Sequence, residues 1–437
     1  MRARFKAARI SHTQNAGRTF VRNLLFAILI ALHPLLAAGA ANAQENDSPN
    51  VAVRDRPQPD YDPRGLRFGG FTIYPQANAE VAYTDNLFAE DVGERSDFVT
   101  TLSPSVRAET NWSRHRVRLD AGVQHVMHAD FSDDDVTNYY VGGEGLLNVG
   151  SRGDIRARAR YTRSSEPRYA VDSPTDAIEP IRYSQTDLAL IATQEFNRLR
   201  LTGALERRDL DYDDTETLLG LIDQDDRDRV ETTATLRGEY RLSPGVALLA
   251  QASFDQYDYD LMPPAVGLNR DSDGRTFLTG ASFDITNLIR GQVAAGYFQR
   301  EFDDPTLPEV SGLAIDTRIE WFPSQLTTVT ATASRRVDDT AFSSAASFTA
   351  ERIGLQVDHE FRRNLIASGR VGYTRRDFLG LNREDDVYSA EAGLTYRMNR
   401  RVGLRLGWRR EDQRSMGANR DRDFVVNEVA AGVTFRL

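Results

Sequence analysis

Segments in which hydrophobic and polar residues alternate recur from Phe68 to the end of the chain. In the stretch 401–409, Val402, Leu404 and Trp408 share one parity, whereas arginines and glycines occupy the other. Successive side chains of a β-strand point to opposite faces, so the alternation predicts strands with one apolar and one polar face. On a helix, the same residues would scatter around all of its sides. The pattern recurs at 117–123, 155–161, 313–321, 353–358 and 429–437.

Turn signals divide these strands into pairs. Short turns are predicted at intervals of roughly 40 residues, near 113–114, 150–153, 197–198, 243–245, 286–287, 323–324, 362–364 and 399–400. Longer, acidic connections lie between them at 130–135, 209–229, 258–273 and 303–309. Short turns on one side and long loops on the other are typical of outer-membrane barrels, where they are periplasmic and extracellular respectively.

The rhythm of turns and loops predicts an all-β protein, a transmembrane antiparallel up-and-down β-barrel over residues 68–437. Eight two-strand units joined by short turns, with one strand before and one after, give about 18 strands, within a range of about 16–18. Both ends of the chain then lie in the periplasm. No stretch after residue 45 approaches the roughly 20 apolar residues of a membrane-spanning helix. A large secreted all-β domain is the alternative, because barrels also look soluble by hydropathy.

The last strand alternates without interruption to the final residue, Leu437, with its aromatic, Phe435, two positions earlier. We expect the barrel-assembly machinery to recognise this strand. An ordinary terminal strand of a soluble sandwich is the alternative, and the spacing of loops and turns argues against it.

The first 43 residues have the composition of a secretory signal peptide. Residues 1–22 are basic without an acid, 24–32 form an apolar core, and Ala41-Asn42-Ala43 places small residues before Gln44. These features predict export to the Gram-negative outer membrane and cleavage after Ala43, with a retained N-terminal anchor helix as the alternative. Residues 44–67 are rich in proline and aspartate, and are predicted to form an extended periplasmic segment or a small insert into the barrel mouth.

Composition excludes several functional classes. The formal net charge is −10, and loss of the six basic residues of the leader leaves about −16, so nucleic acid is not an expected partner. The chain has no cysteine for a disulfide or a lipoprotein anchor. Four histidines follow the leader, and no hydrolase, zinc or phosphate-loop signature is present. We therefore expect no enzyme activity, cofactor or metal site.

The acidic connections allow two interpretations. Their carboxylates could bind divalent cations and bridge to lipopolysaccharide phosphates, because carboxylates ligate Ca²⁺. Solvated acidic loops are the favoured interpretation. In both cases, outer-membrane lipid and lipopolysaccharide are the expected surroundings.

Charged residues of both signs fall on the polar parity of the strands. On a lipid face, an arginine would cost about 2–4 kcal/mol at the bilayer midplane, so the polar parity is predicted to line the lumen. The lining candidates are Arg156, Arg158, Arg160, Asp316, Arg318, Glu320 and Arg405. At about 18 strands, the barrel is wide enough for a hydrated conduit for polar solutes. The alternative is a structural or interaction barrel whose lumen is closed by cross-strand ion pairs and whose acidic loops contact lipopolysaccharide or matrix.

One stretch is distinctive: residues 56–75, followed by Tyr83-Thr84-Asp85-Asn86-Leu87-Phe88, Ser96-Asp97-Phe98 and Leu102-Ser103-Pro104-Ser105. It resembles the β-barrel porins of the barrel porin 2 type in Gram-negative bacteria, most strongly over about residues 56–120. The resemblance implies an outer-membrane porin. Members of this type are often associated with exopolysaccharide export loci, which implies a role in polysaccharide export and export components as partners. It supplies no residue set for a binding site.

Overall fold

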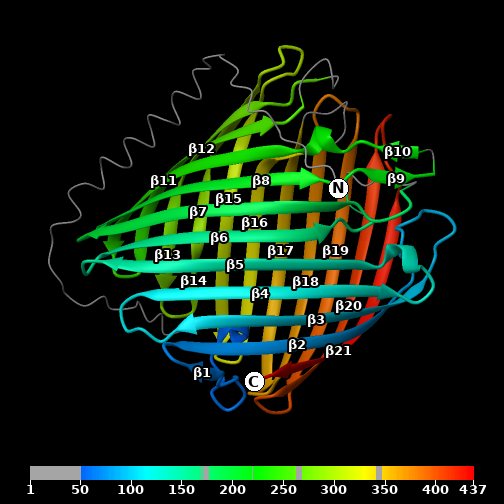
Figure 1. Ribbon diagram of the computed structural model, residues 1–437. Coiled ribbons are helices and arrows are strands. Elements are labelled where there is room, and N and C mark those ends of the chain that lie inside the picture. The colour runs from blue at the N-terminus through cyan, green and yellow to red at the C-terminus, as the bar shows by residue number, and fades with distance from the viewer. Residues whose placement is uncertain (1–50, 169, 171–176, 219, 262–267, 341–346) are drawn as a thin grey trace. The chain divides into compact units, whose positions relative to one another are not determined.

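The structure, a computed structural model, describes residues 51–168, 170, 177–218, 220–261, 268–340 and 347–437. The predicted signal peptide lies outside the described residues. Within them, 18 long strands form the wall of one closed antiparallel sheet (Figure 1). The strands are β2 (Phe71–Thr84), β3 (Asp97–Thr110), β4 (Arg116–His128), β5 (Val136–Val149), β6 (Gly153–Ser165), β7 (Arg182–Phe196), β8 (Leu199–Tyr212), β11 (Arg229–Ser243), β12 (Val246–Tyr259), β13 (Ser272–Ile285), β14 (Ile289–Phe302), β15 (Val310–Ser324), β16 (Thr327–Asp339), β17 (Ser347–Arg362), β18 (Leu365–Phe378), β19 (Glu384–Arg397), β20 (Val402–Met416) and β21 (Phe424–Arg436).

The sheet closes between its first and last long strands. β2 pairs with β3 on one side and with β21 on the other, with Tyr83 opposite Val429 and Ala77 opposite Phe435. The wall strands between β2 and β21 each pair with the wall strand before and the wall strand after in the chain, so that β8 pairs with β11. A closed wall leaves no unpaired strand edge, as a lipid environment requires. The predicted fold class is confirmed, at the upper end of the predicted strand number.

The eight predicted short turns connect strands at one end of the barrel, which we call the turn end. The connection from β13 to β14, for example, holds Thr286 and Asn287 at positive φ, 56° and 57°. The long connections lie at the opposite end, the loop end. One of them carries a small hairpin of β9 (Thr215–Thr217) and β10 (Gly220–Ile222). Among the described residues, no helix is long and apolar enough to cross a membrane.

The two faces of the wall differ as the parity predicts. Large apolar side chains such as Leu119, Val141 and Leu190 are about half exposed on one face. On the other face, charged side chains meet across an intervening strand: Arg160 of β6 contacts Asp120 of β4 at 3.0 Å. Side chains of alternate strands converge on the concave side of a curved wall, so the charged face is the concave one.

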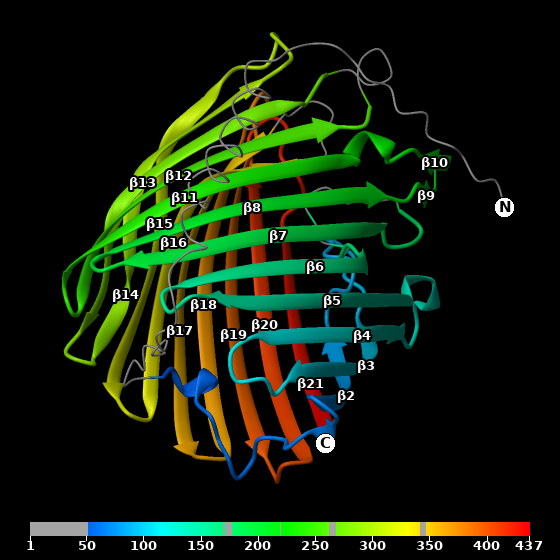
Figure 2. The ribbon, with the colours of Figure 1, turned by 60° about the vertical axis from the view of Figure 1, so that its left-hand side comes forward.

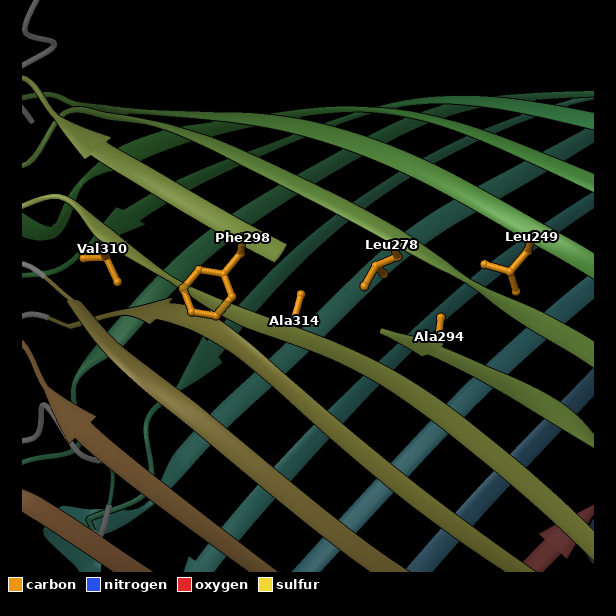
Figure 3. Close-up of a cluster of buried hydrophobic side chains, with 6 residues drawn as sticks. All are labelled: Leu249, Leu278, Ala294, Phe298, Val310 and Ala314. Carbon is orange, nitrogen blue, oxygen red and sulfur yellow. The ribbon is translucent and has the colours of Figure 1, made fainter. Parts of the chain in front are cut away.

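Part of the concave face is apolar, which the sequence did not predict. Leu249, Leu278, Ala294, Phe298, Val310 and Ala314 form a buried cluster on neighbouring strands β12–β15 (Figure 3). Leu249 lies opposite Glu239 in register and so shares the charged parity. The backbones of β13 and β14 approach closely here: a Cβ added to Gly296 would lie 1.8 Å from the carbonyl oxygen of Phe277. We attribute the burial to this close packing at a sharply curved part of the wall.

Candidate functional site: the barrel interior and its mouth

Residues 51–65, here called the N-terminal arm, cross the turn end of the barrel (Figure 2). The arm begins with a short 3-10 helix, η2 (Val53–Asp55), beside the wall. The backbone amide of Val53 donates a hydrogen bond to Oγ1 of Thr328 in β16 at 3.0 Å. Ala52 and Val53 are 0% and 1% exposed. Ala52 and Val53 are therefore packed against the wall and shielded from solvent.

Two arginines of the arm meet three wall carboxylates, Glu320, Asp358 and Glu360, which we call the mouth carboxylates. Arg54 lies 3.1 Å from Asp358 and 3.3 Å from Glu320. Arg56 lies 3.0 Å from Glu360. The mouth carboxylates are only 1–5% exposed. Carboxylates this buried are costly unless cations and hydrogen bonds compensate them, and the arm supplies both.

The arm continues along the wall towards β2, the strand that closes the barrel by pairing with β21. Arg397 of β19 contacts Asp62 at 3.3 Å, and the guanidinium of Arg400 donates to the carbonyl oxygen of Pro59 at 2.9 Å. A short strand, β1 (Leu66–Phe68), then pairs with β2. The arm therefore follows the concave face at the turn end from β15 to β19 before the wall begins.

The predicted arginine row lies on the charged parity of β6. Arg158 contacts Glu144 at 3.0 Å, and Arg160 both contacts Asp120 and stacks on the ring of Tyr140, with 4.1 Å from its guanidinium carbon to the ring centroid. Arg156 forms no ion pair with another described residue. The row is thus partly neutralised by acids of β4 and β5.

Three other predicted residues come together on β15. Arg318 and Arg290 both contact Glu320, and the side-chain amide of Gln292 donates to Asp316 at 3.1 Å. These groups line a cavity of about 720 Å³ at the turn end. Arg405 of β20 belongs to neither group and, among the described residues, has no ion-pair partner.

The sequence pattern predicted Glu320 as a lining residue but did not indicate the role of Arg54 and Arg56. Their signal was weak: two arginines in a proline-rich segment resemble those of a solvated linker. Only contact with acids about 300 positions away gives them a role, because Arg54 and Asp358 are 304 residues apart.

At the loop end, aspartates complete the strand ladders. Asp135, Asp228, Asp271 and Asp423 each directly precede a wall strand. Each accepts a hydrogen bond of 2.7 Å from a backbone amide at the end of the preceding wall strand. Buried backbone donors need such partners. Part of the acidity of the loops therefore has a structural role at the rim.

Asp228 should make its loop pH-sensitive. Burial, and then the nearby charges of Asp211, Asp225 and Asp260, raise the pKa of Asp228 to about 7, although the hydrogen bond from Tyr212 opposes this rise. A raised pKa means that the folded state holds the proton more tightly than the unfolded state. The stabilisation is full below about pH 4 and is lost as the pH rises through about 7.

We therefore expect the amide of Tyr212 to show higher hydrogen-exchange protection at pH 5 than at pH 8, after correction for intrinsic exchange rates. The Asp228→Asn variant keeps an acceptor oxygen but cannot titrate, so its protection should be less dependent on pH. Protection that rises with pH in the unmodified protein would contradict the assignment.

Comparison with known proteins gives one family. The model of the family described as "Putative beta-barrel porin 2" matches residues 58–437. Among curated proteins, none matches the chain. Solved structures that are similar include OccK2 (OpdF) of Pseudomonas aeruginosa, with 12% identity over 86% of this chain and 100% of that chain and a TM-score of 0.46. OccAB3 of Acinetobacter baumannii has 12% identity over 85% and 100% of the two chains, also with a TM-score of 0.46.

Proposed function

Because this chain belongs to the family described as "Putative beta-barrel porin 2", we propose that its barrel forms a hydrated conduit for polar solutes across the outer membrane. The observation that carries the proposal is the solvent exposure of charges on the concave face. The side chains of Arg158, Arg318 and Arg370 are 48%, 53% and 54% exposed. A lumen filled by its own ion-pair network would bury these groups. We therefore propose that the predicted lining residues border water.

The second candidate function, a closed structural barrel, has some support in the pairs of Arg158 with Glu144 and Arg160 with Asp120. Both arginines remain more than a third exposed. Exposed ion pairs contribute only about 0–1 kcal/mol each. These exposed ion pairs therefore contribute little to the stability of the wall, and the conduit is favoured over the closed structural barrel. Passage of a solute through the conduit requires binding and release of the solute and no chemical step.

Swelling of proteoliposomes tests the conduit. Vesicles that contain the folded barrel should swell in an isotonic pentose solution faster than vesicles that contain heat-unfolded protein. A disaccharide should enter more slowly than the pentose, because a pore of fixed width discriminates by size. Equal rates for folded and unfolded protein would favour the closed structural barrel.

Export of an exopolysaccharide is a finer form of the proposal, and it is supported by the family resemblance alone. If the barrel serves this role, cells that lack the gene should retain polymer in the periplasm, and export components should be purified together with the barrel. Normal secretion in such cells would exclude the role while leaving solute passage intact.

We also propose that the leader is cleaved after Ala43. Mass spectrometry of the mature protein should then show that it begins at Gln44.

The proposed topology predicts which segments are accessible from outside. An epitope tag inserted between Tyr212 and Arg229 should be labelled by antibody on intact cells. A tag at Ser243–Gly245, in a short turn, should be labelled only after the outer membrane is opened. The reverse labelling would show that the loop end faces the periplasm and that the assignment of sides is inverted.

A further inference from the structure

We propose that the N-terminal arm is a fixed constriction at the turn end of the lumen, and that Arg54 and Arg56 set the ion selectivity there by neutralising the mouth carboxylates. The inference rests on the proposed conduit and adds to it where the lumen narrows and what controls the charge at that point. It has two parts, one steric and one electrostatic, and each has its own measurement.

The steric part follows from what the arm covers. Thr328 lies on the concave face, yet it is 0% exposed, and Val53 of the arm is bonded to it. Asp358 and Glu360 on the next strand are covered in the same way, at 1% and 4% exposure. Side chains that border an open lumen would contact water. The arm therefore occupies the lumen over this part of the wall.

The arm should stay docked because the wall depends on its charges. Glu320 also contacts Arg290 and Arg318 of the wall. Asp358 and Glu360, by contrast, have no ion-pair partner among the described residues other than Arg54 and Arg56. Undocking would break both ion pairs at once, together with the hydrogen bond between Val53 and Thr328.

The electrostatic part follows from the signs of these charges. With the arm docked, the two arginines balance Asp358 and Glu360 at the mouth. If these positive charges are removed, two carboxylates bear on ions that pass through a narrow opening with low-dielectric walls, which concentrates their field. The mouth then attracts cations and repels anions.

The first experiment measures selectivity in planar bilayers with the full chain. The Arg54→Gln/Arg56→Gln variant should show an anion-to-cation permeability ratio lower by about twofold or more at 0.1 M salt, with a smaller change at 1 M, where charges are screened. Addition of Asp358→Asn and Glu360→Gln to this variant should restore the ratio of the unmodified protein. Arg152→Gln changes an exposed arginine in a turn at the same end, and should have little effect.

The second experiment measures the constriction. Deletion of residues 51–64 should raise single-channel conductance by about 1.5- to 3-fold, because a barrel of this strand number is wide once unobstructed. The chain contains no cysteine, so a Val53→Cys/Thr328→Cys pair can be oxidised selectively. We expect this disulfide to form readily in the folded barrel and to leave conductance unchanged, since the arm is already docked.

The outcomes separate the inference from the proposed function. If the unmodified barrel and the deletion variant both fail to conduct, the conduit proposal is wrong, while formation of the disulfide still reports whether the arm is docked. If the barrel conducts but the deletion changes neither conductance nor selectivity, the constriction is refuted. A disulfide that lowers conductance would show that the arm is mobile, which contradicts a fixed constriction.

Discussion

Replacement of Arg156, Arg158 and Arg160 by glutamate should lower the anion-to-cation permeability ratio of the barrel several-fold at low salt. The three side chains share one face of β6 and span roughly 13 Å at about 3.3 Å per residue. Arginine stays charged over the accessible pH range, so the exchange reverses the local field throughout. The change should be largest where screening is weakest.

The structure makes this result more specific. Glu144 and Asp120 each lose their contact with Arg158 or Arg160 in the variant and face new carboxylates instead. A triple change to glutamine should shift the ratio in the same direction but less far. Arg207→Gln, on the opposite parity of β8, serves as a control that should leave selectivity unchanged.

Two other results would contradict the view that the arginine row borders an open lumen. A lower unfolding temperature with no measurable conductance in any variant would favour a closed network of ion pairs. Unchanged selectivity together with unchanged stability would mean that this face of β6 does not border the lumen.

The Gly296→Ala substitution should disrupt assembly of the barrel. The added methyl carbon would lie 1.8 Å from the carbonyl oxygen of Phe277 on β13, a contact that no side-chain rotation relieves. The paired strands β13 and β14 must separate, and overpacking of this kind costs about 1–3 kcal/mol or more. The folded form, which migrates faster on unheated gels, should decrease strongly.

Gly407 provides the matched control, because a Cβ added there meets nothing within 4 Å. Gly407→Ala should leave the amount of folded barrel nearly unchanged. Equal amounts of folded protein for both variants would show that close backbone packing between β13 and β14 is not required.

The wall could be predicted from the sequence because its rules are local. Alternation predicted strands with two different faces, and turn residues such as Asn197 marked the ends of the strands. The number of strands followed from the number of turns. An even number of antiparallel strands allows β2 and β21 to close the barrel as an antiparallel pair, with Tyr83 opposite Val429.

The side-chain contacts on the concave face could not be predicted in this way. Parity places Leu249 and Phe298 on the concave face, but burial there depends on how sharply the wall bends. Similarly, the pairing of Arg54 with Asp358 depends on a fold that brings the arm back to β17. Such contacts depend on the closed barrel as a whole, and no local signal encodes them.

Recordings of the purified, folded barrel in planar bilayers test the central claim most directly. A hydrated conduit predicts stepwise insertion events, each adding a constant conductance that increases with salt concentration. Protein whose folded state is established by faster migration on unheated gels, but which adds no conductance over repeated insertions, would contradict the claim.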